Sequence, residues 1–247
     1  MTAVDDPQPA PAPAPPRRRS GLRRVLHGFS SVLIVAGVLL LADAGLTVAW
    51  QEPLSAFYAG QQQGKLNAQL EDLGSTVIAT PAEKKALAAL PDPTRRIAFA
   101  ARALDRKAKD GQAIARIRIP AIGLSKVIVE GTGTGDLHKG PGHYPRTPLP
   151  GAPGTVAVAG HRTTYGAPFR KVDQLHRGDR ITMQMPYATV TYRVERTRIV
   201  EPTDTWVVAR RSYDRLVLTA CHPLYSAAKR IVVFARQVSA KPSKSLA

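Results

Sequence analysis

Three residues of this sequence have side chains that together can carry out nucleophilic chemistry. Cys221, the only cysteine, ends an apolar run with strand character, LVLTAC. Arg230 starts a second such run shortly afterwards, and His161 lies just after the strand-like TVAVA, in a loop with Gly160 before it. A thiolate, an imidazolium and a guanidinium at strand ends can attack a carbonyl, transfer a proton and stabilise an oxyanion.

Each of these residues also has a structural interpretation. A free cysteine is most often a small buried core residue. A histidine after a strand is most often a surface or hydrogen-bonding group. Only the combination of the three favours a catalytic site, so the rest of the chain decides between a nucleophile and an inert cysteine.

The composition limits which classes of partner and cofactor the protein is expected to bind. The formal charge of +17 suits an anionic membrane or cell wall and raises nucleic acid as a partner. The basic residues are scattered, and no aromatic–basic, zinc-ligand or helix-turn-helix pattern is present, so we expect no nucleic-acid binding. One cysteine excludes an intrachain disulfide, and the six histidines are not paired at metal-ligand spacing. We therefore expect no metal and no other cofactor.

The N-terminal part predicts a membrane anchor. Residues 1–28 form a Pro/Ala-rich tail that becomes basic toward its end and is expected to be disordered. Residues 29–50 form an apolar run with one acid, Asp43, and are long enough to cross a bilayer core of about 30 Å. The preceding arginines place the N-terminus in the cytoplasm and the remainder outside, with Trp50 at the outer interface.

A cleaved signal peptide is the competing interpretation of this segment. Residues 32–41 have the length of its apolar region, and Ala42-Asp43-Ala44 resembles a cleavage site. The apolar character continues past Ala44, and the segment before the apolar core is unusually long, which favours an uncleaved single-pass anchor. Both interpretations place the rest of the chain outside the cytoplasm.

Residues 51–110 have the composition of helices. Helix-forming residues dominate 54–73 and 81–109, and Thr80-Pro81-Ala82-Glu83 has the pattern of a capping box. Prolines 91 and 93 are expected to break the second stretch. The segment shows no catalytic constellation, so we expect a helical extracellular linker that lifts the next domain off the membrane and can pack against it.

From residue 111 the pattern changes to short strands. Alternating or apolar runs occur at 114–119, 126–130, 155–159, 180–185, 189–200, 216–219 and 231–236. Short helical patches occur only near Asp136 and over 169–175, so no βαβ rhythm is present. The spacing predicts an all-β domain, best a closed or nearly closed antiparallel barrel of about eight strands, with a sandwich as the alternative.

Two glycine-containing segments are expected to be turns and loops. Residues 131–137 read GTGTGDL, whose glycine spacing does not fit a dinucleotide-binding site, so a turn and a short helix are expected there. Residues 141–145 read PGHYP and are loop by composition.

Over residues 111–238 the chain resembles the sortase family. That family carries a Thr-Leu-x-Thr-Cys motif at the end of a barrel strand, and residues 217–221 read VLTAC here. The segments AGHRTTYGAPF, GPGHYP and CHP are similar to class E, the type of high-GC Gram-positive bacteria. The resemblance implies a closed sortase-type β-barrel at 111–238, preceded by the transmembrane helix and helical linker and followed by a flexible tail at 239–247.

The resemblance implies a cysteine transpeptidase that needs no cofactor. Cys221, as a thiolate, attacks the Thr carbonyl of a C-terminal sorting signal and splits Thr from Gly, leaving a thioester. His161 protonates the leaving amine and later takes a proton from the incoming amine. Arg230 binds the oxyanion or the substrate backbone through donors in a fixed plane. The implied partners are surface proteins with sorting signals and an amine acceptor from a peptidoglycan precursor or a pilin.

The resemblance also suggests which residues contact the signal. Class E enzymes are associated with LAxTG rather than LPxTG signals, and Tyr144 is the candidate for recognising the Ala position. Thr219 and His222, on either side of the nucleophile, are further candidates for substrate contact. Val217 and Ala220 replace the usual residues of the cysteine motif and remove hydroxyl groups. Neither is a catalytic group, so we expect activity to be retained and either the substrate fit or the positioning of Cys221 to be altered.

Two other functions use the same residues differently. An inert binding or scaffold protein on a sortase barrel would leave Cys221 without a chemical role, which the complete set of His161, Cys221 and Arg230 disfavours. An L,D-transpeptidase also uses Cys and His outside the membrane. Its Ser-His-Gly-Cys order puts His before Cys, whereas His222 follows Cys221 here.

Overall fold

The computed structural model describes residues 21–49, 53–73, 77, 80–244 and 246. The chain divides into two compact units, Met1–Gly45 and Leu46–Ala247. Helix α1 (Gly21–Ala49) begins inside the expected tail, because Arg23 and Arg24 are good helix formers and extend the apolar run. Its segment Arg23–Gly45 is long and apolar enough to cross a membrane, a test that a signal sequence also passes. Trp50 lies outside the described residues.

The linker contains three helices, α2 (Pro53–Leu73), α3 (Pro81–Ala88) and α4 (Pro93–Asp105). The capping box at the start of α3 is confirmed, since Glu83 N donates to Thr80 Oγ1 at 3.1 Å and Thr80 N donates to Glu83 Oε2 at 3.2 Å. The predicted break between α3 and α4 is also present. Helix α2 packs on the barrel, where the Gln63 side chain bonds both the N–H and the carbonyl of Val127.

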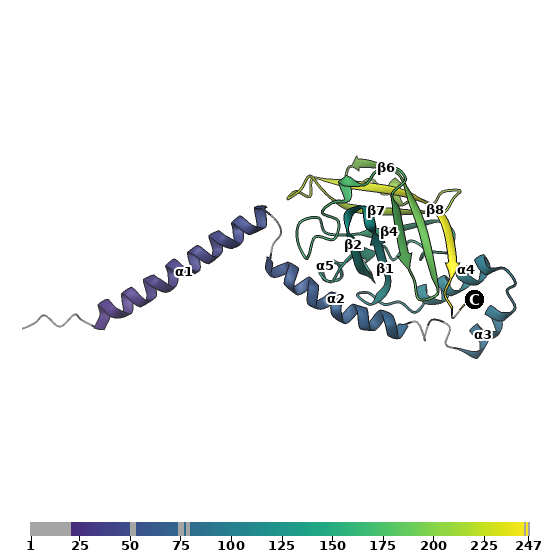
Figure 1. The fold of residues 1–247 in the computed structure, drawn as a ribbon, viewed down its shortest axis with the longest axis horizontal. Helices are drawn as coiled ribbons and strands as arrows, with labels where there is room; N and C mark the ends of the chain where they lie inside the picture. The colour runs from purple at the N-terminus through teal and green to yellow at the C-terminus, as the bar shows by residue number, and fades with distance from the viewer. Residues whose placement is uncertain (1–20, 50–52, 74–76, 78–79, 245, 247) are drawn as a thin grey trace, which may run out of the picture. The chain divides into compact units, whose positions relative to one another are not determined.

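Eight strands close into a barrel in the order β1-β2-β3-β4-β7-β8-β6-β5. Figure 1 shows the long strands β6 and β8 beside each other in this barrel. Their bounds are β1 (Ala113–Ile119), β2 (Leu124–Glu130), β3 (Gly142–His143), β4 (Thr155–Ala159), β5 (Arg180–Gln184), β6 (Ala188–Val200), β7 (Arg215–His222) and β8 (Lys229–Pro242). Short helices lie between them, namely η1 (Pro120–Ile122), α5 (Thr134–Leu137), η2 (Val172–Gln174) and η3 (Thr205–Val208). The closed all-β barrel predicted from the strand spacing is therefore confirmed.

The expected antiparallel pairing holds for six of the eight strand pairs but not for the other two. Strands β2 and β3 are parallel, and so are β4 and β7. The β4–β7 pair is parallel because β5 and β6 are inserted between them in sequence, and the chain crosses over before it returns beside β4. Two loop assignments also differ, since residues 142–143 form β3 and β8 continues to Pro242. The expected flexible tail thus begins inside a strand, because Ser239–Pro242 pair with the first residues of β6.

Candidate active site

Cys221 lies near the end of β7, on the outer face of the barrel. Leu218 and Ala220 of the same strand belong to the cluster that fills the barrel. Val217 packs instead in a second cluster with Phe234. Because successive strand residues face opposite sides, Cys221 shares the outer face with Val217. The thiol therefore ends the outer-face row of β7, after Val217 and Thr219, and is half-buried.

This alternation separates the two unusual residues of the cysteine motif. Ala220 is 4% exposed and faces the barrel core, so it is not placed to contact a substrate on the outer face. An effect of Ala220 on the positioning of Cys221, its neighbour in β7, stays a prediction. Val217 lies in the outer cluster against which Tyr144 packs.

Arg230 lies directly opposite Cys221 in the antiparallel β7–β8 pair. Directly opposed residues place their side chains on the same face of a sheet, so the guanidinium and the thiol share the outer face. Arg230 Nη1 donates to the carbonyl oxygens of Ala227 at 2.8 Å and Lys229 at 3.0 Å, which holds the guanidinium at the strand end. Lys229 pairs with Glu201 at 3.4 Å.

The parallel β4–β7 pair places His161 at the same end of the barrel. Ala159 pairs with Thr219, and Gly160 N donates to the Thr219 carbonyl at 3.0 Å. His161 and Cys221 each lie two residues beyond the Ala159–Thr219 pair. A side chain at Gly160 is excluded, because its Cβ would lie 2.6 Å from the Phe169 ring.

His161 is enclosed by two aromatic side chains. Its ring centroid lies 5.2 Å from that of Tyr165 and 6.0 Å from that of His138, and these two rings stack on each other at 3.8 Å. Burial, and secondarily the charge of His138, lower the pKa of His161. A lowered pKa leaves a larger fraction of the His161 ring neutral at a given pH and makes the imidazolium that does form a stronger proton donor.

Arg162 is the main residue of the site that the sequence interpretation missed. Its side chain is only 3% exposed and pairs with Asp173 at 2.9 Å. Its Nη1 lies 3.0 Å from His222 Nδ1 and 3.5 Å from the Cys221 carbonyl oxygen. Because a guanidinium has only donors, His222 accepts at Nδ1 and carries its proton on Nε2. Arg162 lies in the segment AGHRTTYGAPF. A charged residue in a loop is expected to be exposed, so the sequence did not predict its burial.

Tyr144 and Thr219 lie together, as their shared candidate role requires. The Tyr144 hydroxyl is 3.0 Å from Thr219 Oγ1, two residues along β7 from Cys221. The segment that carries Tyr144 is anchored by His143, whose ring contacts Glu130 Oε2 at 2.9 Å and Thr147 Oγ1 at 3.0 Å. The buried His143 thus fixes the position of Tyr144 over β7.

The linker helix α2 reaches the loop that follows His161. Tyr165 N donates to Ser55 Oγ at 2.9 Å, and the Tyr58 and Tyr165 rings meet edge to face at 6.5 Å. Ala59 of α2 is 3% exposed and would contact a side chain at Gly166. The linker therefore packs on the domain, as the sequence allowed, and supports the ring that covers His161.

The model of the sortase domain family matches residues 117–238. Sortase D of Bacillus subtilis (strain 168) is 34% identical over 137 residues, which are 54% of this chain and 68% of that protein. Sortase E of Streptomyces avermitilis is 33% identical with a TM-score of 0.50, over 56% of this chain and 99% of that one. A Clostridium perfringens sortase D5 transpeptidase is 25% identical with a TM-score of 0.56, over 72% and 99%.

Together, the barrel and these relatives define a cysteine transpeptidase. The chain belongs to the sortase family.

Proposed function

We propose that this chain is a membrane-anchored class E sortase. It cleaves a sorting signal of the LAxTG type, with LPxTG as the other signal to test, between Thr and Gly. It then transfers the protein to an amine acceptor of the cell wall. The observation that carries the proposal is the register of β7 with its two neighbours, which sets Arg230 opposite Cys221 and His161 at the same strand end.

In the proposed reaction each of the three side chains has one role: Cys221 is the nucleophile, Arg230 binds the oxyanion and His161 transfers the proton. The Cys221 thiolate attacks the Thr carbonyl carbon, and Arg230 donates to the oxyanion that forms. The C–N bond then breaks as the His161 imidazolium gives its proton to the Gly nitrogen. In the second half, the acceptor amine attacks the thioester and its proton returns to His161. The cycle thereby regenerates a thiolate and an imidazolium.

The assignment to class E rests on the motifs rather than on overall similarity. Identity to sortase D of B. subtilis and to sortase E of S. avermitilis is nearly equal, at 34% and 33%. CHP is one of the three class E-like segments, with AGHRTTYGAPF and GPGHYP, and its His222 has a specific partner in Arg162 at 3.0 Å. This buried contact gives His222 a defined orientation beside the nucleophile, which supports a role for it in the site.

The proposed location is the outer face of a cell membrane, with α1 as a single-pass anchor and residues 51–110 as an extracellular linker. The arginines before the apolar segment support this orientation. The partners are then surface proteins that carry a sorting signal, the acceptor amine of a peptidoglycan precursor or pilin, and the lipid bilayer.

The test is mass spectrometry of the full chain in detergent micelles with LAxTG- and LPxTG-type peptides and an added amine. We expect a thioester adduct on Cys221 and an amide product joined through the Thr carbonyl. An unmodified Cys221 with both peptides would support the inert scaffold instead. The ratio of the two products identifies the preferred signal.

Replacing Tyr144 with Phe is expected to change the preference between the two signals. The substitution removes the hydrogen bond to Thr219, which is worth about 1 kcal/mol, so the ratio of the two kcat/KM values should change about fivefold. Tyr213→Phe is the matched control, because the Tyr213 hydroxyl bonds Glu195. Unchanged selectivity in the Tyr144 variant would remove this residue from signal recognition.

Replacing Arg162 with Lys is expected to lower kcat on the order of tenfold, since a misplaced catalytic group slows the reaction. An ammonium keeps the positive charge but lacks the planar fork that spans Asp173, His222 and the Cys221 carbonyl. The ¹⁵N resonance of His222 Nδ1 should also move as its donor is lost. Arg170→Lys is the control, and a native-like His222 signal in the Arg162 variant would contradict the positioning role.

A further inference from the structure

The proposed function gives the bound peptide a direction on the barrel. Its Thr carbonyl lies at Cys221 and its Ala, two residues earlier, lies at Thr219, so the preceding chain runs toward the start of β7. Extended peptides and strands both advance by about 3.3 Å per residue. The residue three positions before the Leu of the signal therefore comes level with Arg215, the first residue of β7.

A hollow of about 320 Å³ lies at this end of the outer face. It is lined by Arg146, Thr147, Pro148, Pro153, Gly154, Thr155, Val208 and Arg210. Thr155 pairs with Arg215 across the β4–β7 ladder, and Val208 packs with Tyr144 on the apolar outer cluster. The hollow thus continues the row that ends at Cys221, and its two charged lining residues are both arginines.

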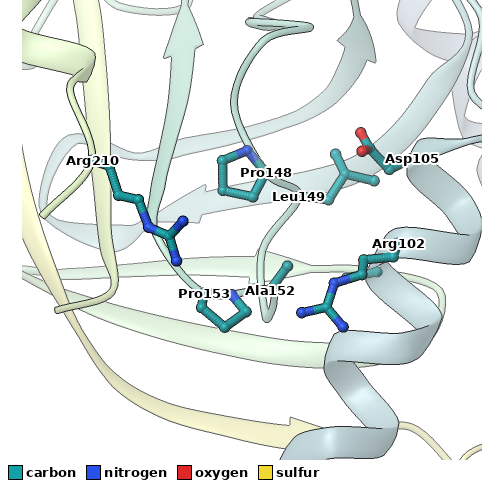
Figure 2. Close-up of a pocket in the computed structure, with 8 residues that line it drawn as sticks. Arg102, Asp105, Pro148, Leu149, Ala152, Pro153 and Arg210 are labelled. Atoms are coloured by element: carbon teal, nitrogen blue, oxygen red, sulfur yellow. The ribbon is translucent and has the colours of Figure 1, made fainter. Parts of the chain in front are cut away.

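A second hollow, also of about 320 Å³, shares Arg210, Pro148 and Pro153 with the first. Figure 2 shows Arg102 and Arg210 extending from opposite sides toward Ala152 and Pro153, whereas Asp105 lies beyond Leu149. Burial raises the pKa of Asp105, which also lines this second hollow. The two hollows together are lined by three arginines from three separate segments, Arg102, Arg146 and Arg210, and by this one acid.

Arginines outnumber acids by three to one among the residues that line the two hollows. No ion pair in the described part of the chain involves Arg102, Arg146 or Arg210. Arg215, next to the hollow, is 1% exposed and bonds Thr155 Oγ1 and two carbonyl oxygens, without a carboxylate partner. Its Nη1 has no hydrogen-bond partner. Arg146 and Arg210 are exposed and line the hollow without an ion-pair partner among the described residues, so the hollow itself favours an anionic ligand.

We propose that this arginine-lined hollow binds acidic side chains that lie two to four residues before the Leu of the sorting signal. The inference rests on the proposed function, which supplies the direction of the peptide. Guanidinium groups bind carboxylates through paired N–H donors, and Arg146 and Arg210 line the hollow beside the expected path. The enzyme would thus select its substrates by the charge before the signal as well as by the signal itself.

The test compares three sorting-signal peptides that carry Asp, Asn or Lys three residues before the Leu, with the full chain in detergent micelles. We expect kcat/KM to be about fivefold higher for Asp than for Asn, mainly through KM, and lowest for Lys. High salt should reduce the difference, since the arginines are partly exposed to solvent. Arg210→Glu and Arg146→Glu should each reverse the order of the Asp and Lys peptides.

Arg118→Glu is the matched control, because it changes the net charge equally from an exposed position on β1, across the closed barrel from β7. The order of the peptides should not change in this variant. Equal kcat/KM values for all three peptides would overturn the subsite and leave the proposed function standing, as would an equal effect of Arg118→Glu. Failure of every peptide to form a thioester would overturn the proposed function and the subsite together.

Discussion

Replacing Cys221 with Ala is expected to abolish thioester formation and to lower turnover on the order of a millionfold, as removal of a nucleophile does in related covalent mechanisms. In the proposed mechanism the thiol forms the acyl intermediate. The fold should survive, because Cys221 is half-buried and its neighbours Ala220 and Leu218 hold β7 in the core. Mass spectrometry with a sorting-signal peptide measures the adduct, and thermal unfolding measures the fold.

The informative control is His161→Ala, which keeps the nucleophile but removes the proton donor. Alkylating reagents should distinguish the two variants. The His161 variant retains the Cys221 thiol and should be alkylated, whereas the Cys221 variant should not. An acyl adduct on another residue or a transpeptidation product from the Cys221 variant, with native melting behaviour, would show that another group is the nucleophile.

Replacing Arg230 with Lys is expected to lower kcat/KM by roughly a hundredfold or more, the effect of removing one oxyanion donor. Lysine keeps the charge but not the planar set of N–H groups, so it cannot hold the carbonyls of Ala227 and Lys229 and also donate to the oxyanion. Steady-state transfer of a peptide to an amine measures the loss.

Lys229→Gln is the neighbouring control. Lys229 lies opposite His222 rather than Cys221 and pairs with Glu201, so its loss should change kcat/KM little. Near-normal kinetics in the Arg230→Lys variant would show that charge alone is sufficient at this position. A large loss of kcat/KM in the Lys229→Gln variant would show that Lys229, rather than Arg230, supplies the required cation.

The local elements of the fold follow from short-range patterns. Prolines and the Thr80 capping box define the starts and breaks of α3 and α4, and apolar alternation defines most strands. The two-residue strand β3 could not be predicted this way. Its residues are Gly142 and His143, and they are extended because they pair with β2 and β4 rather than through any propensity of their own.

The sequence by itself determined the three candidate catalytic residues, because their types and their places at strand ends are local properties. Only the tertiary structure decided how they meet. The parallel β4–β7 register joins residues about sixty positions apart, and core packing rather than local sequence sets it.

The same packing decided which neighbours belong to the site. It buries Arg162 against His222 and turns Ala220 away from the outer face. It also brings Arg102, Arg146 and Arg210, which are far apart in the sequence, to the two neighbouring hollows. Charge and residue type are visible in a sequence, but burial and the face of a strand depend on residues far along the chain, which only folding brings together.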